Sequence, residues 1–172
     1  MKFLSENNID TLFYKSFPRF YNNLGSDEVD YNLFILKANL YRRDSALVIN
    51  LKNKIEFQNR RKRSIKKGKK FNVEIIESNS FNEFWNEILI PNLKLRHNVL
   101  PVHSLDEIEL LANKFPENIK QFNAYINSKI IAGTTIFETP TVAHAQYISA
   151  SEEGRKNGGL DFLFEQLINE KY

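Results

Sequence analysis

The stretch from residue 122 to residue 150 constrains the fold most, because it repeats a strand pattern three times with only short turns between the repeats. Apolar residues recur at every second position of the first repeat, which is typical of a β-strand with one buried face. The turns are Asn127-Ser128 and Thr139-Pro140. Connections this short cannot hold a parallel crossover, so the sequence predicts an antiparallel meander. Its three strands are expected at residues 122 to 126, Lys129 to Glu138 and Thr141 to Ala150.

Two amphipathic helices are predicted before the meander. Ser80 with Glu83, and Ser104 with Glu107, have the spacing of a capping box, in which both side chains accept hydrogen bonds from free backbone amides at a helix start. Pro91 lies inside the first pattern and is expected to kink or restart that helix. Both segments have apolar residues at helical spacing. These are Phe81, Phe84, Trp85, Ile88 and Leu89, and then Leu105, Ile108, Leu111, Ala112 and Phe115.

The first 76 residues have weaker patterns. Apolar runs at Tyr31 to Ala38 and Ala46 to Ile49 predict a hairpin across the polar turn between them. Leu51 to Lys67 predicts a helix that ends at Gly68. The alternation from Phe71 to Ile76 predicts a strand.

Composition excludes several kinds of site. The chain of 172 residues has no cysteine and three histidines, which rules out disulfides and thiolate metal sites, and we expect no metal. Hydrophobic residues make up 42% and charged residues 26%, enough for a buried core. No window approaches about 18 consecutive apolar residues, and the N-terminus lacks a signal-peptide pattern. We therefore expect a cytoplasmic protein with no membrane span.

Positive charge is concentrated in residues 60 to 70. This stretch contains eight Lys and Arg residues, so the remainder is mildly acidic although the net charge is +3. Such a stretch can contact a nucleic-acid backbone. It can equally be a solvated helix face that steers an anionic donor. The second interpretation is favoured, because no RNA-stacking motif accompanies the cations.

The junction between the third strand and the final helix is the most informative unit. A glycine-bearing loop is expected from Ser151 to Gly159, and the helix follows from Leu160. A strand that enters a helix through glycines leaves backbone amides directed at the space before the helix, where the helix dipole adds positive potential. Glycine also lets a ligand approach the backbone without a Cβ clash. The junction therefore predicts a phosphate or diphosphate site, although two glycines also suit a plain tight turn.

The order of strand, two helices, meander, glycine-bearing loop and helix resembles the GNAT acyltransferase fold. In that family a Q/R-x-x-G-x-G/A pattern before the third helix holds the diphosphate of coenzyme A. The segment Arg155-Lys156-Asn157-Gly158-Gly159-Leu160 matches the arginine and the first glycine, and departs at Leu160, where the family has Gly or Ala. The resemblance implies an α+β, GNAT-like fold with a central, mostly antiparallel sheet flanked by helices and lacking the C-terminal strands.

Further segments are similar to the Fem-like branch of this fold. They are the basic stretch Arg60 to Gly68 before Val73 to Ile75, Arg96-His97, Pro101-Val102-His103, Phe115-Pro116 and Ala132-Gly133. The resemblance covers about residues 51 to 172, expected as a GNAT-like acyltransferase domain that is incomplete at its C-terminus. Residues 1 to 50 are expected as an N-terminal segment, a remnant of a first GNAT-like half.

The resemblance also implies a donor and a set of site residues. The donor would be acetyl-CoA or another acyl-CoA, bound by the loop and by edge-strand backbone that pairs with its extended arm. Histidines before the second helix would face the acceptor, and histidine titrates in the range useful for a base. The candidate catalytic residues are His97, His103 and Tyr147. The candidate donor-binding residues are Tyr147, Ile148, Ser149, Arg155, Lys156, Asn157, Gly158 and Gly159.

The expected function is transfer of an acyl group from coenzyme A to an amine or hydroxyl. The acceptor would be a small molecule or a cell-envelope precursor. Two alternatives stay open. One is a Fem-like aminoacyltransferase that uses aminoacyl-tRNA, and the other is a non-catalytic module that binds RNA or an acidic partner through residues 60 to 70. A homo-oligomer that covers the open sheet edge is a further expectation.

Overall fold

The computed structural model describes residues 2 to 172, which divide into two compact units at Leu47 and Val48. The first unit contains α1 (Lys2–Glu6), a short 3-10 turn (Arg19–Tyr21) and α2 (Glu28–Ile35). None of residues 3 to 47 is buried. The hairpin predicted over residues 31 to 49 is wrong, because α2 occupies the first run and the second run forms no strand. A lone hairpin is marginal in water without a third strand or a packed face.

The second unit, Val48–Tyr172, is built on one four-stranded antiparallel sheet. The strands β1 (Glu74–Ser78), β2 (Ile119–Ile126), β3 (Lys129–Glu138) and β4 (Ala143–Ala150) lie in sequence order, so β1 and β4 are the edges. The predicted meander and the α+β class are thereby confirmed. Asn127 and Ser128 both have positive φ, as expected for the primed turns that join hairpin strands.

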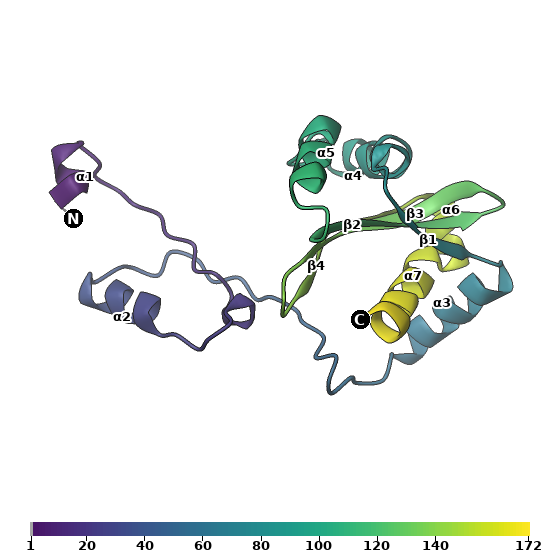
Figure 1. Cartoon of the computed structure of the whole chain (residues 1–172), viewed down its shortest axis with the longest axis horizontal. Coiled ribbons are helices and arrows are strands. Elements are labelled where there is room, and N and C mark those ends of the chain that lie inside the picture. Colours follow the sequence, from purple (N-terminus) through teal and green to yellow (C-terminus); the bar gives the residue numbers. More distant parts are fainter. Residues whose placement is uncertain (1) are drawn as a thin grey trace. The chain divides into compact units, whose positions relative to one another are not determined.

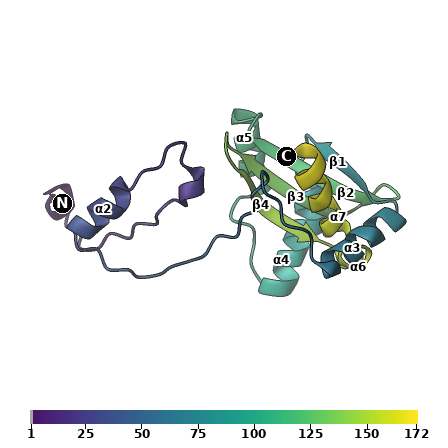
Figure 2. The ribbon, with the colours of Figure 1, turned by 90° about the horizontal axis from the view of Figure 1, so that it is seen from below.

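Helices cover both faces of this sheet (Figure 1). One face bears α3 (Asn59–Lys70), α6 (Glu152–Asn157), α7 (Gly159–Gln166) and a π-helical last turn (Leu167–Lys171). The other bears a π-helical segment η2 (Phe84–Leu89), α4 (Ile90–His97) and α5 (Leu105–Lys114). Figure 2 shows α7 over the strands and α3 beside it. The second unit therefore has three layers: helices, sheet and helices.

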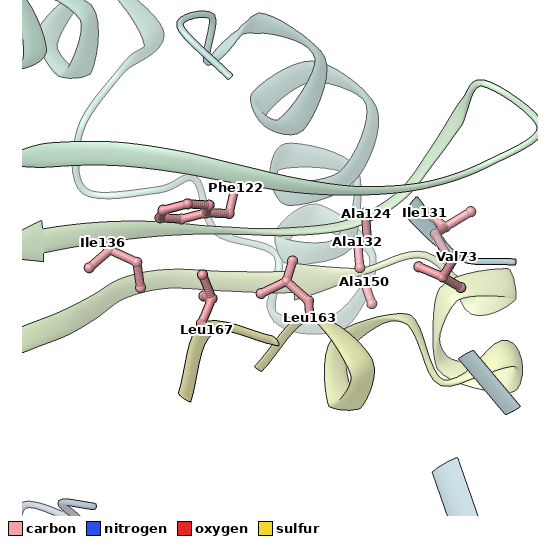
Figure 3. Packing of buried hydrophobic residues seen from close by; sticks show 9 residues of the cluster. All are labelled: Val73, Phe122, Ala124, Ile131, Ala132, Ile136, Ala150, Leu163 and Leu167. Atoms are coloured by element: carbon pink, nitrogen blue, oxygen red, sulfur yellow. The ribbon is translucent and has the colours of Figure 1, made fainter. Parts of the chain in front are cut away.

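Each interface between helices and sheet has its own core. Figure 3 shows Leu163 and Leu167 directed from the α7 side toward the strands, in a cluster of nine residues. The other members are Val73, Phe122, Ala124, Ile131, Ala132, Ile136 and Ala150. On the opposite face Phe84 and Trp85 are fully buried, each with 0% of its surface exposed. Truncating an aromatic residue of this kind to alanine costs about 3 to 5 kcal/mol.

The bounds of α3 correct one expectation. The helix begins at Asn59 and not near Leu51, and Ile55 is 88% exposed, so the apolar spacing before residue 59 marks no packed face. Gly68 does not end the helix. It lies buried inside α3, where an added Cβ would stand 2.5 Å from the Cβ of Phe162. Gly68 therefore serves close packing of α3 on α7.

The two predicted capping boxes have different outcomes. Ser104 and Glu107 form theirs at the start of α5, as predicted. The box at Ser80 is wrong, because the Oγ of Ser80 accepts from the amide of Asn82 and the carboxylate of Glu83 accepts from the hydroxyl of Tyr125. A tertiary partner on β2 has replaced the local one.

Candidate functional site

The junction after β4 is a helix and not the loop that the sequence predicts. Ser151 caps α6, since its Oγ accepts from the amide of Gly154 at 3.0 Å, and acidic residues in the first turn with basic residues in the last suit the helix dipole. Only Gly158 separates α6 from α7. The connection between the last strand and the last helix is therefore rigid along most of its length.

Two independent features of the structure require a glycine at position 158. Its φ is +78°, in the left-handed region that favours glycine, and its amide donates to the carbonyl of Gly154 as the cap of α6. An added Cβ would also stand 2.1 Å from the carbonyl oxygen of Ser64 on α3. Gly158 thus lets the backbone of α3 contact the α6–α7 turn. Gly159 packs against the sheet instead, because a Cβ added there would stand 2.8 Å from Cδ1 of Ile131 on β3.

A pocket of about 540 Å³ opens where α3 meets this turn. The α3 wall supplies Arg60, Arg61, Arg63, Ser64 and Lys67. The opposite wall supplies Gly154, Arg155, Gly158, Leu160 and Asp161. The basic stretch and the glycine junction, which are separate features in the sequence, therefore line one cavity. We call it the α3 pocket.

Helical spacing explains which cations of α3 reach the pocket. Arg60, Arg63 and Lys67 stand at positions i, i+3 and i+7, on one face of the helix. Gly68 is buried against Phe162 of α7, and Ile65 is also buried. Among residues 2 to 172, no carboxylate forms an ion pair with Arg60, Arg63 or Lys67. Three unneutralised cations therefore line one wall.

The other two cations of the pocket are engaged. Arg61 pairs with Asp161 at 2.8 Å, which links α3 to α7. Arg155 donates through its guanidinium to the carbonyl oxygen of Ala150, at the end of edge strand β4. With five cationic side chains and one carboxylate, the lining has a net charge of +4. Such a surface attracts anions, and guanidinium groups bind phosphate oxygens with bidentate geometry.

On the opposite face of the sheet, His103 and Tyr147 form a hydrogen-bonded pair. The hydroxyl of Tyr147 lies 2.6 Å from Nδ1 of His103 and accepts from the His103 amide at 3.1 Å. A hydroxyl accepts up to two hydrogen bonds and donates one, so the direction of the bond to Nδ1 follows the tautomer of His103. In the tautomer where the hydroxyl donates to Nδ1, the proton of the neutral imidazole lies on Nε2. Trp85 packs against the pair, with its ring centroid 5.0 Å from that of Tyr147.

The remaining predicted residues lie at several places. His97 is exposed at the end of α4, and none of the hydrogen bonds described for the His103–Tyr147 pair involves it. Ile148 is 48% exposed on edge strand β4. Ser149 accepts from the amide group of Asn92 at 2.8 Å, which ties α4 to the strand. Lys156 and Asn157 line a separate open pocket with Ser151 and Phe71, outside the α3 pocket.

Sequence reasoning missed a polar chain on β2. Thr135 donates to Gln121 at 2.6 Å, Gln121 to Asn123 at 2.7 Å, Asn123 to the hydroxyl of Tyr125 at 3.1 Å, and Tyr125 to Glu83. Burial, followed by the hydrogen bond to the Glu83 carboxylate, raises the pKa of Tyr125. The alternation of Gln121, Asn123 and Tyr125 along one strand is the signal that could have predicted a shared polar face.

No family model matches this chain, and no curated protein matches it either. In the described part of the chain, no group of three or more His, Asp or Glu residues gathers as metal ligands. None of the described helices has the length and apolar character needed to cross a bilayer.

Proposed function

We propose that this chain is an acyltransferase of the GNAT-like, Fem-like type, which moves an acyl group from coenzyme A to an amine or hydroxyl acceptor. Three features support the proposal. The element order around the antiparallel sheet agrees with that resemblance. The α3 pocket is a cationic cavity at the predicted donor junction. Edge strand β4 runs from Tyr147 directly into α6, the helix that bears Arg155.

The α3 pocket is the observation on which the proposal depends. A diphosphate has two negative charges, and the net charge of +4 around the pocket attracts an anion of that kind. Gly154 and Gly158 contribute backbone without side chains to the same lining. The donor diphosphate would lie beside Arg155 and Gly158. Its pantetheine arm would follow the edge of β4, where backbone groups can pair with an extended chain.

The reaction requires few protein groups once both substrates are positioned. The acceptor nitrogen or oxygen bonds to the acyl carbon, the carbon–sulfur bond breaks, and the proton lost by the acceptor neutralises the departing thiolate. In the tautomer that we propose, the Tyr147 hydroxyl donates to Nδ1 and His103 has its proton on Nε2. His103 would then donate a hydrogen bond to the thioester oxygen as negative charge develops there. This role differs from the base expected from the sequence, and Tyr147 would be a positioning residue.

Binding of acetyl-CoA, measured by isothermal titration calorimetry at low salt, tests the proposal. The test variant is Arg60→Gln/Arg63→Gln, which removes two unpaired cations from the pocket lining. The matched control is Lys66→Gln/Lys70→Gln, which removes the same charge from the same helix at residues outside that lining. We expect the first pair to weaken binding about tenfold or more, and the second to change it less than about threefold.

The same variants, measured for binding of tRNA as well as acetyl-CoA, test the nucleic-acid alternatives. If the wild-type chain does not bind acetyl-CoA, the acyl-CoA proposal is wrong. If it instead binds tRNA with strong salt dependence, and both double variants weaken that binding to a similar degree, the basic helix acts as a nucleic-acid surface. Equal loss is expected there because a phosphate backbone responds to the number of cations and not to their membership of one pocket.

A further inference from the structure

The α3 pocket has more positive charge than a diphosphate alone would neutralise. Its five cations and one carboxylate give a net charge of +4, whereas a diphosphate that bridges two esters contributes two negative charges. Two positive charges therefore remain. A phosphomonoester contributes about 1.5 to 2 negative charges at neutral pH, because its second pKa is about 6. The lining thus matches one diphosphate together with one phosphomonoester.

The excess charge lies on a single wall. Arg60 and Lys67 are seven positions apart on α3, with Arg63 between them, which corresponds to about 10 Å along the helix axis. Arg155 stands on the opposite wall with Gly158, and Arg61 is already neutralised by Asp161. Two anionic groups can therefore bind at different places in one cavity. The group near Arg155 would be the diphosphate, and the α3 wall would bind the second.

The chemistry of the α3 wall favours a terminal phosphate. Two guanidinium groups separated by three residues can each bind two oxygens of a phosphomonoester, which has three free oxygens. Lys67, one helical turn from Arg63, adds a point charge. In the part of the chain described by the structure, no carboxylate competes for these three cations.

We propose that the face of α3 formed by Arg60, Arg63 and Lys67 recognises the 3′-phosphate of coenzyme A. This inference rests on the proposed function, because it assigns a second anionic group of the same donor. It predicts that the protein distinguishes coenzyme A from 3′-dephospho-coenzyme A, which has the same diphosphate and pantetheine arm. The α3 wall is then a specificity element, separate from the residues that contact the thioester.

The test compares the affinities of the full chain for coenzyme A and 3′-dephospho-coenzyme A by calorimetry. We expect the wild-type chain to bind dephospho-coenzyme A about tenfold more weakly or worse. Arg63→Gln should weaken coenzyme A binding and leave dephospho-coenzyme A binding almost unchanged. The ratio of the two affinities should therefore fall toward one. Lys66→Gln, on the same helix but outside the pocket lining, should leave the preference at its wild-type value. Circular dichroism of each variant checks that α3 remains folded.

The possible outcomes distinguish failure of this inference from failure of the proposed acyl-CoA function. Equal binding of the two ligands would overturn the inference and leave the acyl-CoA proposal standing. A preference that survives Arg63→Gln and Arg60→Gln unchanged would also overturn it, because the 3′-phosphate would then bind elsewhere. Failure of both ligands to bind the wild-type chain would overturn the inference together with the proposed function.

Discussion

Gly158 is constrained both by its own backbone and by a neighbouring helix. Its positive φ closes α6, and its missing side chain admits the Ser64 carbonyl of α3. A glycine that the family resemblance assigns to ligand contact therefore has a complete structural explanation. Substituting it is a poor test of binding, because the helix contact would be lost first. The cationic side chains around it are the better targets.

Gly158→Ala should destabilise the second unit by about 1 to 3 kcal/mol, since alanine combines an unfavourable φ with a 2.1 Å approach to the Ser64 oxygen. Thermal unfolding followed by circular dichroism measures the loss. Gly25→Ala is the matched control, because Gly25 has no atom within 4 Å of the added Cβ and has no positive φ. A Gly158→Ala protein that unfolds at the wild-type temperature would show that α3 does not contact this turn in solution.

The proposed function requires that the Tyr147 hydroxyl donates to Nδ1 of His103 and that the imidazole proton lies on Nε2. Tyr147→Phe should remove the acceptor preference of Nδ1 and leave the His103 amide without its partner, at a cost of about 1 kcal/mol in stability. Long-range ¹H–¹⁵N spectra of the imidazole report the tautomer directly. We expect a protonated Nε2 in the wild type and a mixture in the variant. A wild-type spectrum with the proton on Nδ1 would contradict the assigned geometry.

At the scale of elements, α3 has two functions on two faces. One face packs on α7 through Gly68 and the Arg61–Asp161 ion pair, and the other lines the pocket with unpaired cations. Asp161 thereby neutralises a pocket cation while it joins the two helices. Partly exposed ion pairs contribute only about 0 to 1 kcal/mol to stability, so the electrostatic effect on the pocket outweighs the structural one.

Asp161→Asn should therefore strengthen anion binding while it changes stability by less than about 1 kcal/mol. The substitution frees Arg61 and raises the net charge of the lining by one. Acetyl-CoA affinity measured against salt concentration should show a higher affinity and a steeper salt dependence than the wild type. Glu153→Gln, which removes an equal charge from a residue outside the α3 pocket, is the control. Equal effects of the two variants would indicate a response to overall charge only.

Sequence analysis correctly predicted the elements whose signals come from residues close together in the chain. The meander followed from short turns, and the Ser104–Glu107 capping box from residues three positions apart. Elements that depend on distant partners were predicted wrongly. Gly68 has the position of a helix stop, but it packs against Phe162 and α3 continues beyond it. Glu83 has the spacing of a capping residue, but its carboxylate accepts from Tyr125 instead. The α3 pocket required contact between residues 100 positions apart, such as Arg61 and Asp161, which no periodicity reveals.

At the scale of the whole chain, the buried residues belong to the second unit. Residues 3 to 47 include none, although they contain many exposed aromatic and aliphatic side chains. Both hydrophobic clusters lie within Val73–Leu167 and Phe81–Tyr147. The stability of the second unit should therefore depend on its own two cores and its four strands.

A chain that begins at Val48 should fold with the same unfolding temperature as the full chain, to within about 2 to 4 °C. Limited proteolysis of the full chain should first cut before residue 59, because residues 2 to 58 contain no strand and no helix longer than α2, and leave a stable fragment that contains α3 to Tyr172. Circular dichroism and mass spectrometry measure the two results. An unfolded fragment would show that the first 47 residues complete the core.

The most direct test of the central claim is a ¹H–¹⁵N correlation spectrum of the full chain titrated with acetyl-CoA. The account predicts saturable shifts concentrated at the amides of Gly154, Arg155 and Gly158 and at the guanidinium groups of Arg60 and Arg63, with smaller changes along β4. Shifts confined to other surfaces, or a spectrum unchanged at millimolar acetyl-CoA, would contradict it.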